Sequence, residues 1–555
     1  MHQAWTRLAS RHPERNAQNA TICVPTTAKL LMILLIMSTL RDRAKILLHD
    51  ERNVRFFNLY LAVRMPLVGL AKAVFYGPAV FLQIPWQDAY LWRIRALSDA
   101  LATYCNSSDY SLQRAEKLKS QATKYLAQLR QFAPQLQAAA ELEGRIALCV
   151  GHTEEWLAAQ FRSFEYQELR ANKAPALSPP TRILANTFHI LVGIGATLGL
   201  DTYVKAGILG LRPPTRTVFI LEKHLKSRIA NPCLLDYWRS YIDFIEDETE
   251  VRLLRPFQNE LAVNPFGLVQ CGPNNTLFAM SAAVFINAKW QQQKRAPLLQ
   301  LTPEHKIRGD NELQKMGIPD HAWLVTLHVR HGSFGNHRIN EPFRDADIST
   351  YYDAITFITN RGGWVVRMGD LSMPDLPKMH HVVDYAHSRH KSDWMDVYLC
   401  ASARLMIGTS SGVATVSHAF GIPIAMTNYL PTATLYLSQH DMFIPRLMRR
   451  IADGTMRSFS EIMGLPISMG VSSPLYKNVW GLEVIPNTSD EISGLAQEML
   501  DNLDGTASYS IEDNLLQKQF KAITADRETL IGLRGMELPP RIGRHFLNKH
   551  KNLLH

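Results

Sequence analysis

A regular alternation of strand-like and helix-like segments in the C-terminal part of the chain constrains its fold most strongly. The expected strands are short apolar runs at 323–330, 364–368, 382–385, 405–407 and 424–426, and the expected helices between them are 348–359, 393–403 and 411–420. Glycines at 362, 363 and 421 end two of these helices. Alternation at this spacing predicts a parallel sheet with helices on both faces over residues 320–535.

Towards the N-terminus, the residue composition and the spacing of apolar residues change twice. Residues 91–175 are rich in Ala, Leu, Gln, Lys and Glu, and apolar residues such as Leu112, Ala115 and Leu118 recur at helical spacing. This pattern predicts two or three antiparallel helices, with a tetratricopeptide-like arrangement as an alternative. The Pro-rich residues 174–180 are typical of a linker, and residues 181–315 predict an earlier α/β domain.

Inside residues 181–315 we expect a strand at 218–221 and an amphipathic helix at 234–245, with a domain boundary at 309–319. Residues 1–90 form a segment with apolar stretches whose pattern predicts no particular fold. The basic tail at 536–555 either contacts an anionic surface or frays.

Charge and cysteine content narrow the classes of protein. The formal net charge of +10 favours anionic partners such as nucleotide phosphates, although a diffuse excess of this kind can also carry no meaning. No basic-aromatic motif accompanies it, so we expect no nucleic-acid partner. The six cysteines lie far apart and form no C-x-x-C pair, which argues against a disulfide framework and a zinc site and favours reduced thiols in a cytosolic compartment.

Two apolar stretches near the N-terminus raise the question of a membrane. Residues 30–37 are too few to span a bilayer, and Lys72, Gly77 and Pro78 interrupt the apolar run at 66–85. We expect both stretches to be buried or interfacial and the protein to be cytoplasmic. Peripheral association with the inner face of the membrane is an alternative, because basic residues flank the first stretch.

Small and polar residues follow the predicted strands at the points where the strands end. In an open parallel sheet, ligands bind beyond the carboxyl ends of the strands. The sequence therefore predicts a site at this edge of the sheet. Its candidate residues, in strand order, are His328, Arg330, His331 and Gly332, then Arg367, then Asp384, then Thr409, Ser410, Ser411 and Gly412, and last Asn428.

The segment from Gly408 to Gly412 joins a strand to a helix start. Unpaired backbone N–H groups at a helix N-terminus bind phosphate, and glycine allows a close approach, so a diphosphate cradle is one interpretation. An ordinary Ser/Thr helix cap is the other. Arg330 and Arg367 end two strands and should point into one cleft, where guanidinium groups would bind phosphate bidentately. For a single arginine, a surface position is the alternative.

Asp345 and Asp347 form an Asp-x-Asp pair before a predicted helix. Such a pair can hold Mg²⁺ or Mn²⁺ against a diphosphate. Because the pair precedes a helix and does not end a strand, helix capping is the favoured interpretation, and we expect no metal.

Two stretches carry a resemblance to a known family. His-Val-Arg-His-Gly at 328–332 resembles the His-x-Arg strand end of the fucosyltransferase superfamily, especially the α1,6-fucosyltransferases. Residues 396–412 resemble the later helix, strand and Ser/Thr segment of the same superfamily. The chain is more similar still to bacterial glycosyltransferases of surface-polysaccharide gene clusters, to which residues 230–238 also show similarity. The resemblance spans 181–500 and is firm from 323 to 428.

The resemblance implies a GT-B-like architecture, in which two Rossmann-type domains with parallel sheets face each other after the helical region. It implies an inverting, metal-independent glycosyltransferase without a cofactor, whose partners are a nucleotide-diphosphate sugar (GDP-linked in one alternative) and a glycan or lipid-linked acceptor. Residues 335–340 differ from the best-known fucosyltransferases, so the sugar need not be fucose. The rival hypothesis is a non-catalytic binding or scaffold protein with a degenerate α/β domain.

By the same resemblance, individual residues acquire roles. Arg330 would bind the donor diphosphate, with Arg367 and Asp384 completing the candidate catalytic set. Asp384 or Asp396 would hold the base or ribose of the donor. His189 in the first domain is a candidate general base, and a packed histidine is the alternative. The remaining candidate donor-binding residues are His328, His331, Gly332, Thr409, Ser410, Ser411, Gly412 and Asn428.

Overall fold

The structure is a computed structural model that describes residues 80–105, 110–174, 177–185, 194–332, 344–430, 438–464, 473–525 and 540–555. The chain forms two compact units, residues 1–96 and 97–555, and both sheets and every pocket discussed below belong to the second. The stretch 30–37, most of 66–85, the segment 335–340 and His189 lie outside the described residues. Among the described helices, none combines the length and the apolar character needed to cross a bilayer.

Helices dominate the first described part of the chain, as the sequence predicted. They are α4 (Val80–Cys105), α5 (Leu112–Phe132), α6 (Gln137–Cys149) and α7 (Thr153–Lys173). In α5 the buried Ala115, Leu118 and Ala122 form one apolar stripe, because residues three and four apart share a helix face. The hydroxyl of Ser111 caps the start of this helix.

A four-stranded parallel sheet follows, in the order β3-β2-β1-β4. Its strands are β1 (Thr181–Leu184), β2 (Arg216–Ile220), β3 (Asp243–Ile245) and β4 (Ala262–Val263). The elements around it are η1 (Ile194–Ala196), α9 (Thr197–Ile208), η2 (Lys223–Arg228), α10 (Pro232–Trp238), α11 (Glu248–Leu254), η3 (Arg255–Phe257), the hairpin of β5 (Leu268–Gln270) and β6 (Thr276–Phe278), and α12 (Ala279–Gln292).

One predicted element of this region is wrong. The helix expected at 234–245 stops at Trp238, and the last three residues form β3. Phe244 and Ile245 are buried beside Phe219 and Ile220 of β2, so pairing across the sheet outweighs the local helical spacing of apolar residues. The segment expected to form a boundary at 309–319 also differs, because α13 (Pro303–Lys315) continues through its first half. This helix packs against α15 (Asp393–Ser402) of the C-terminal part, where Asp310 accepts a hydrogen bond from Tyr398 at 2.6 Å.

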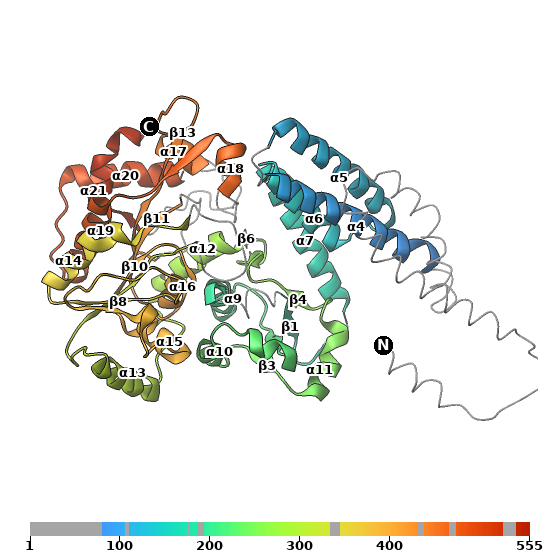
Figure 1. The fold of residues 1–555 in the computed structure, drawn as a ribbon. Coiled ribbons are helices and arrows are strands. Elements are labelled where there is room, and N and C mark those ends of the chain that lie inside the picture. Colours follow the sequence, from blue (N-terminus) through green and yellow to red (C-terminus); the bar gives the residue numbers. More distant parts are fainter. Residues whose placement is uncertain are drawn as a thin grey trace, which may run out of the picture. The chain divides into compact units, whose positions relative to one another are not determined.

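The C-terminal sheet has seven parallel strands in the order β15-β12-β11-β10-β7-β8-β9. Figure 1 labels three of them, β8, β10 and β11. These are β7 (Leu324–His328), β8 (Trp364–Arg367), β9 (Val382–Asp384), β10 (Leu405–Gly408), β11 (Ile424–Tyr429), β12 (Met442–Pro445) and β15 (Arg541–Ile542). The other elements are η5 (Ile348–Tyr351), α14 (Tyr352–Asn360), η6 (Tyr385–His387), α15 (Asp393–Ser402), α16 (Gly412–Ala419), β13 (Leu447–Arg450), α17 (Phe459–Gly464), α18 (Ser473–Asn478), β14 (Leu482–Ile485), α19 (Ser489–Leu503), α20 (Ile511–Ala525), α21 (Arg544–Lys549) and η7 (Lys551–Leu553).

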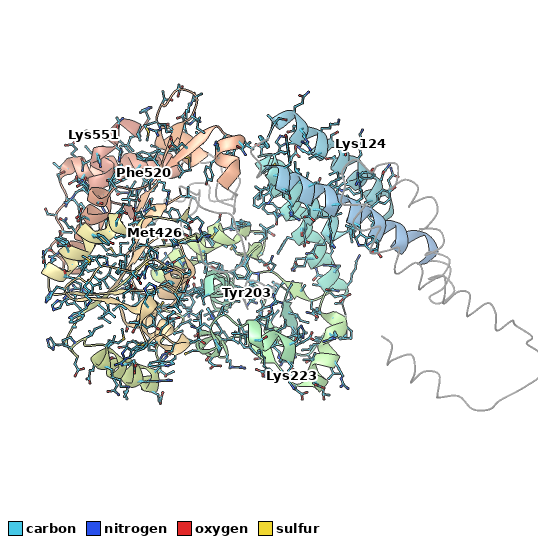
Figure 2. The ribbon with its side chains drawn as sticks, viewed as in Figure 1. Lys124, Tyr203, Lys223, Met426, Phe520 and Lys551 are labelled. Carbon is cyan, nitrogen blue, oxygen red and sulfur yellow. The ribbon has the colours of Figure 1, made fainter. Side chains whose placement is uncertain are left out.

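All five strands and three helices predicted between 323 and 428 are present, with ends shifted by a few residues. Figure 2 shows Met426 and Tyr203 inside the layers and Lys223 and Lys551 at the periphery, in agreement with their burial. The predicted fold class, an α/β protein with two parallel sheets after a helical region, is confirmed.

The segment described at the C-terminal end is part of this sheet. The basic composition of 536–555 predicted a tail, but Arg541–Ile542 pairs with β12, and Phe546 and Leu547 of α21 are buried. The basic residues lie on its other face, where Lys549 and His550 contact Glu491 at 3.1 and 2.7 Å. The apolar residues interleaved with the charged ones explain why the segment packs.

Strand order fixes where a ligand can enter. From β7 the chain moves outward through β8 and β9, and then it returns to the other side of β7 with β10, β11 and β12. The order therefore reverses between β7 and β10, whose last residues His328 and Gly408 are paired. Helices after the two strands leave on opposite faces at such a point, so a crevice opens beyond the carboxyl ends of the strands.

Candidate functional site

A pocket of about 430 Å³ lies at this reversal point. The C-terminal part lines it with residues that directly follow β8, with residues of α15, and with His328, Arg330, Ser411 and Gly412. Ile194, Gly195 and Asn231 line it from the part of the chain that builds the first sheet. The pocket thus lies between the two α/β parts.

The strand end at Gly408 is too crowded for any side chain. Its φ is +154°, and a Cβ atom there would collide with the carbonyl oxygen of His328. The next residue, Thr409, is buried, and its backbone N–H donates to the same carbonyl at 3.0 Å. The Thr409 hydroxyl accepts from the backbone N–H of Arg330 at 3.0 Å. Thr409 therefore fixes the start of the Arg330 loop and does not line the pocket.

Ser411 is the N-cap of α16, since its hydroxyl accepts from the backbone N–H of Ala414 at 3.4 Å. The capping interpretation of the segment is confirmed, while the diphosphate cradle stays a prediction. Gly412 begins the helix, and a Cβ atom on it would lie 2.6 Å from Ile194 and 2.9 Å from the backbone nitrogen of Gly195. Ser410 does not line the pocket, but its carbonyl accepts from Arg344 at 2.9 Å.

Two cationic side chains that line this pocket form ion pairs with carboxylates. Arg330 contacts Asp345 at 3.0 Å, and Lys391 contacts Asp396 at 3.1 Å. Burial raises the pKa of Asp345, although the nearby Arg330 opposes this shift, and burial likewise raises the pKa of Asp396 against the charge of Lys391. An anionic ligand could replace Asp345 as the partner of Arg330 and Asp396 as the partner of Lys391, because burial disfavours the ionised form of both carboxylates.

His328 is a deeply buried polar residue of the pocket wall. It is 9% exposed, and its Nδ1 atom has no hydrogen-bond partner among the described residues. Burial and the charge of Arg367 lower the pKa of His328 to about 4, so the imidazole is neutral at neutral pH. A neutral imidazole offers a ligand one donor and one acceptor.

Arg367 and Asp384 do not reach this pocket, contrary to the sequence prediction that Arg367 points into the same cleft as Arg330. Arg367 is 1% exposed and donates to Asp384 and to the carbonyl of Pro374, both at 2.8 Å. Burial opposes ionisation of Asp384, but hydrogen bonds from His387 and the charge of Arg367 lower its pKa overall. A buried guanidinium requires such partners, so the pair holds the end of β8 to the end of β9.

Asp384, Asp375 and His387 together are the one group of potential metal ligands among the described residues. His387 contacts Asp384 at 2.9 Å and Asp375 at 3.2 Å, and none of the three residues lines the pocket. The charge of Arg367 beside Asp384 disfavours a cation there.

Asn428 does not line the pocket either, although the sequence predicted a role for it in donor binding. It is buried with a φ of +51°, and its side chain exchanges hydrogen bonds with Asn487 and Tyr351. His331 lines the pocket, whereas Gly332 lies beside it against Asp345. Asp347 caps η5 through the backbone N–H of Ser349 at 2.9 Å, which confirms the capping interpretation for that residue.

Reasoning from the sequence missed several residues of the pocket wall. Arg344 and Lys391 line it but follow no predicted strand and carry no motif of their own. Asn231 was noticed only within a resembling stretch. Its side chain accepts from the backbone N–H of Leu234 and donates to the carbonyl of Asp393, each at 2.8 Å, and so it joins the two walls of the pocket. The N-cap pattern Asn231-Pro232 was the available signal.

Comparisons with known proteins add distant structural similarities. No protein-family model and no curated protein matches the sequence. A glycosyl transferase family 9 structure from Veillonella parvula is 11% identical with a TM-score of 0.35, over 58% of this chain and 97% of that one. The bacterial iron-containing dodecameric glycosyltransferase TibC from enterotoxigenic E. coli is 14% identical with a TM-score of 0.27, over 45% of this chain and 59% of that one. Both similarities are too distant to assign a function to this chain.

Proposed function

We propose that the protein is a glycosyltransferase that binds a nucleotide-diphosphate sugar in the pocket between its two α/β parts. The observation that carries the proposal is the convergence, at the reversal point of the C-terminal sheet, of Arg330, Arg344 and Lys391 with the N-terminus of α16. Such a combination suits a diphosphate, because both the guanidinium groups and the unpaired N–H groups of the helix favour phosphate oxygens.

In this proposal the leaving nucleoside diphosphate is stabilised as its charge grows. Arg330 exchanges Asp345 for phosphate, and the neutral His328 donates a hydrogen bond to the ligand. An acceptor hydroxyl of a glycan or lipid carrier attacks the anomeric carbon, with inversion and without a metal, in the synthesis of a surface polysaccharide. The attack needs a general base, for which Asp370 and Asp393 are the carboxylates on the pocket wall that carry no cationic partner in the described ion pairs.

Thermal stabilisation by nucleotides tests the proposal directly. A ligand that binds only the folded state raises the melting temperature by mass action. We expect one of GDP, UDP, TDP, CMP or ADP to stabilise the wild-type protein and to lose affinity by about tenfold or more in Arg330→Ala, because a charge-assisted hydrogen bond contributes roughly 1.5–3 kcal/mol.

The matched control is Arg252→Ala on α11, whose side chain is largely exposed and is not part of the pocket lining. This variant should respond to the nucleotide as the wild type does. Absence of any nucleotide response from folded wild-type protein would contradict the proposal and favour the binding or scaffold alternative.

A further inference from the structure

A second pocket, of about 400 Å³, lies between the helical region and the first sheet. Its floor is formed by Ala185 directly after β1, by Ala262 of β4 and by Asn264 directly after β4. The strand order β3-β2-β1-β4 reverses between β1 and β4, so this pocket occupies in the first sheet the position that the nucleotide pocket occupies in the second.

The helices α6 and α7 supply the opposite wall. Gln137 comes from α6, while Gln160, Ser163 and Gln167 come from α7. Helix α7 packs beside β5 and beside β4, which Figure 1 shows near it. Gln167 is buried and donates to the carbonyl of Ala262 at 2.6 Å, and its own side-chain oxygen accepts from Gln137 at 3.4 Å. This chain of amides holds the helices on the sheet edge and leaves the rest of the wall to a ligand.

Two polar side chains of this wall make no hydrogen bond to a described residue. Ser163 is 7% exposed and lines the pocket, yet its hydroxyl makes no hydrogen bond to any described residue. The amide of Gln160, one helical turn away on the same face, likewise has no hydrogen-bond partner among the described residues. Ser163 is nearly removed from water, and such polar groups normally have a partner, so its position at the cavity points to a polar ligand. Gln160 is half-buried and adds an amide to the same wall.

The chemistry of the wall selects the ligand class. Amide and hydroxyl groups both donate and accept, and only Glu141 brings a charge into the pocket. Such a wall suits neutral molecules with many hydroxyl groups and suits neither phosphate nor an aliphatic chain. Phe164 adds one apolar ring, against which the C–H face of a sugar can pack.

We infer that this pocket binds the glycan part of the acceptor, with the helical region as one of its walls. The inference rests on the proposed function, since it assigns the acceptor side of the same transferase. It gives α6 and α7 a role in recognition and predicts that sugar binding here is independent of the nucleotide.

A glycan array probed with the full-length protein tests this assignment. The probes are neutral oligosaccharides built from glucose, galactose, mannose, rhamnose and N-acetylhexosamines. We expect the wild type to bind a subset, and Ser163→Ala and Gln160→Leu each to weaken that binding about tenfold or more. Gln128→Leu, on the exposed face of α5, is the matched control and should bind as the wild type does.

The nucleotide melting assay, run on the same variants, separates this inference from the proposed function. Unchanged nucleotide stabilisation in Gln160→Leu, together with lost glycan binding, supports two separate subsites. Failure of the wild type to bind any array glycan, or retention of full binding by both variants, overturns the inference even if nucleotides bind. Glycan binding that depends on Ser163 without any nucleotide response overturns the transferase proposal and leaves a glycan-binding protein.

Discussion

At the residue scale, the nucleotide pocket depends on positions where a side chain is excluded. Gly408 adopts a φ of +154° beside the carbonyl of His328, and this contact brings the ends of β10 and β7 together. Gly412 plays a similar part where α16 meets Ile194 from the first α/β part. The sequence interpretation was that these glycines let a phosphate come close, whereas their contacts show that they permit close approach of neighbouring protein atoms.

We predict that Gly408→Ala destabilises the protein by more than about 2 kcal/mol, because it combines a strained φ with a backbone collision. Gly454→Ala is the control, since Gly454 also has a positive φ of +72° but no atom near the added methyl group. That variant should lose only about 1 kcal/mol. Urea unfolding measures both, and equal losses would show that the collision at Gly408 relaxes at little cost.

At the scale of elements, the last residues of the chain show how a basic segment becomes part of a sheet. β15 pairs with β12, and α21 buries Phe546 against Phe459 at a ring distance of 6.3 Å. The backbone N–H of Gly543 donates to the carbonyl of Phe443 at 2.9 Å. The segment thus covers the edge of β12, which would otherwise expose unpaired backbone groups.

Phe546→Ala should destabilise the protein by about 3–5 kcal/mol, as removal of a fully buried aromatic ring usually does. Leu515→Ala on the neighbouring α20 is the control, because Leu515 is 55% exposed and its loss should change stability by less than about 0.5 kcal/mol. The two free energies of unfolding from denaturant titration give the comparison. A small effect of Phe546→Ala would mean that the segment is dispensable.

At the scale of the whole second unit, buried polar side chains join helices of the two α/β parts. Lys205 of α9 contacts Asp201 at 2.7 Å and donates to Asn287 of α12 at 3.0 Å. Asn287 in turn lies 3.0 Å from Nε2 of His418 on α16. Burial and the charge of Lys205 lower the pKa of His418 to about 3, so this nitrogen accepts from the Asn287 amide. Protonation would place two donors face to face.

This contact predicts an acid-sensitive junction. The folded-state pKa of His418 lies below its ordinary value of 6.5, so its contribution to stability is present above pH 6.5 and is lost as pH falls toward 3. Below pH 6.5 the wild type should therefore lose up to about 1.4 kcal/mol per pH unit more than His418→Gln, which keeps an acceptor but cannot titrate. Unfolding free energies at several pH values measure the slopes.

His440→Gln serves as the control for that series, because His440 is exposed in the described structure. Its pH slope should match the wild type. Parallel slopes for the wild type and His418→Gln would contradict the assignment of a neutral His418 in the junction.

The sequence alone determined the parallel C-terminal sheet, the helical region and the edge at which His328, Arg330 and Ser411 gather. Strand-helix periodicity, glycine stops and strand-end polar residues are local signals, and local signals survive folding when the packing agrees with them. The same local reasoning failed at 234–245, where a strand was hidden in a helical pattern, because only pairing with β2 distinguishes the two.

Tertiary structure decided which candidates share a pocket. Arg367 and Arg330 both follow strands, yet Arg367 turns to Asp384 while Arg330 faces the cleft. The direction of a side chain at a strand end depends on where a buried charge finds its partner, and that partner is remote in sequence. For the same reason, only the folded chain shows that Asn231 lies at the edge of the C-terminal sheet and that Gln160 and Gln167 of α7 lie at the edge of the first sheet.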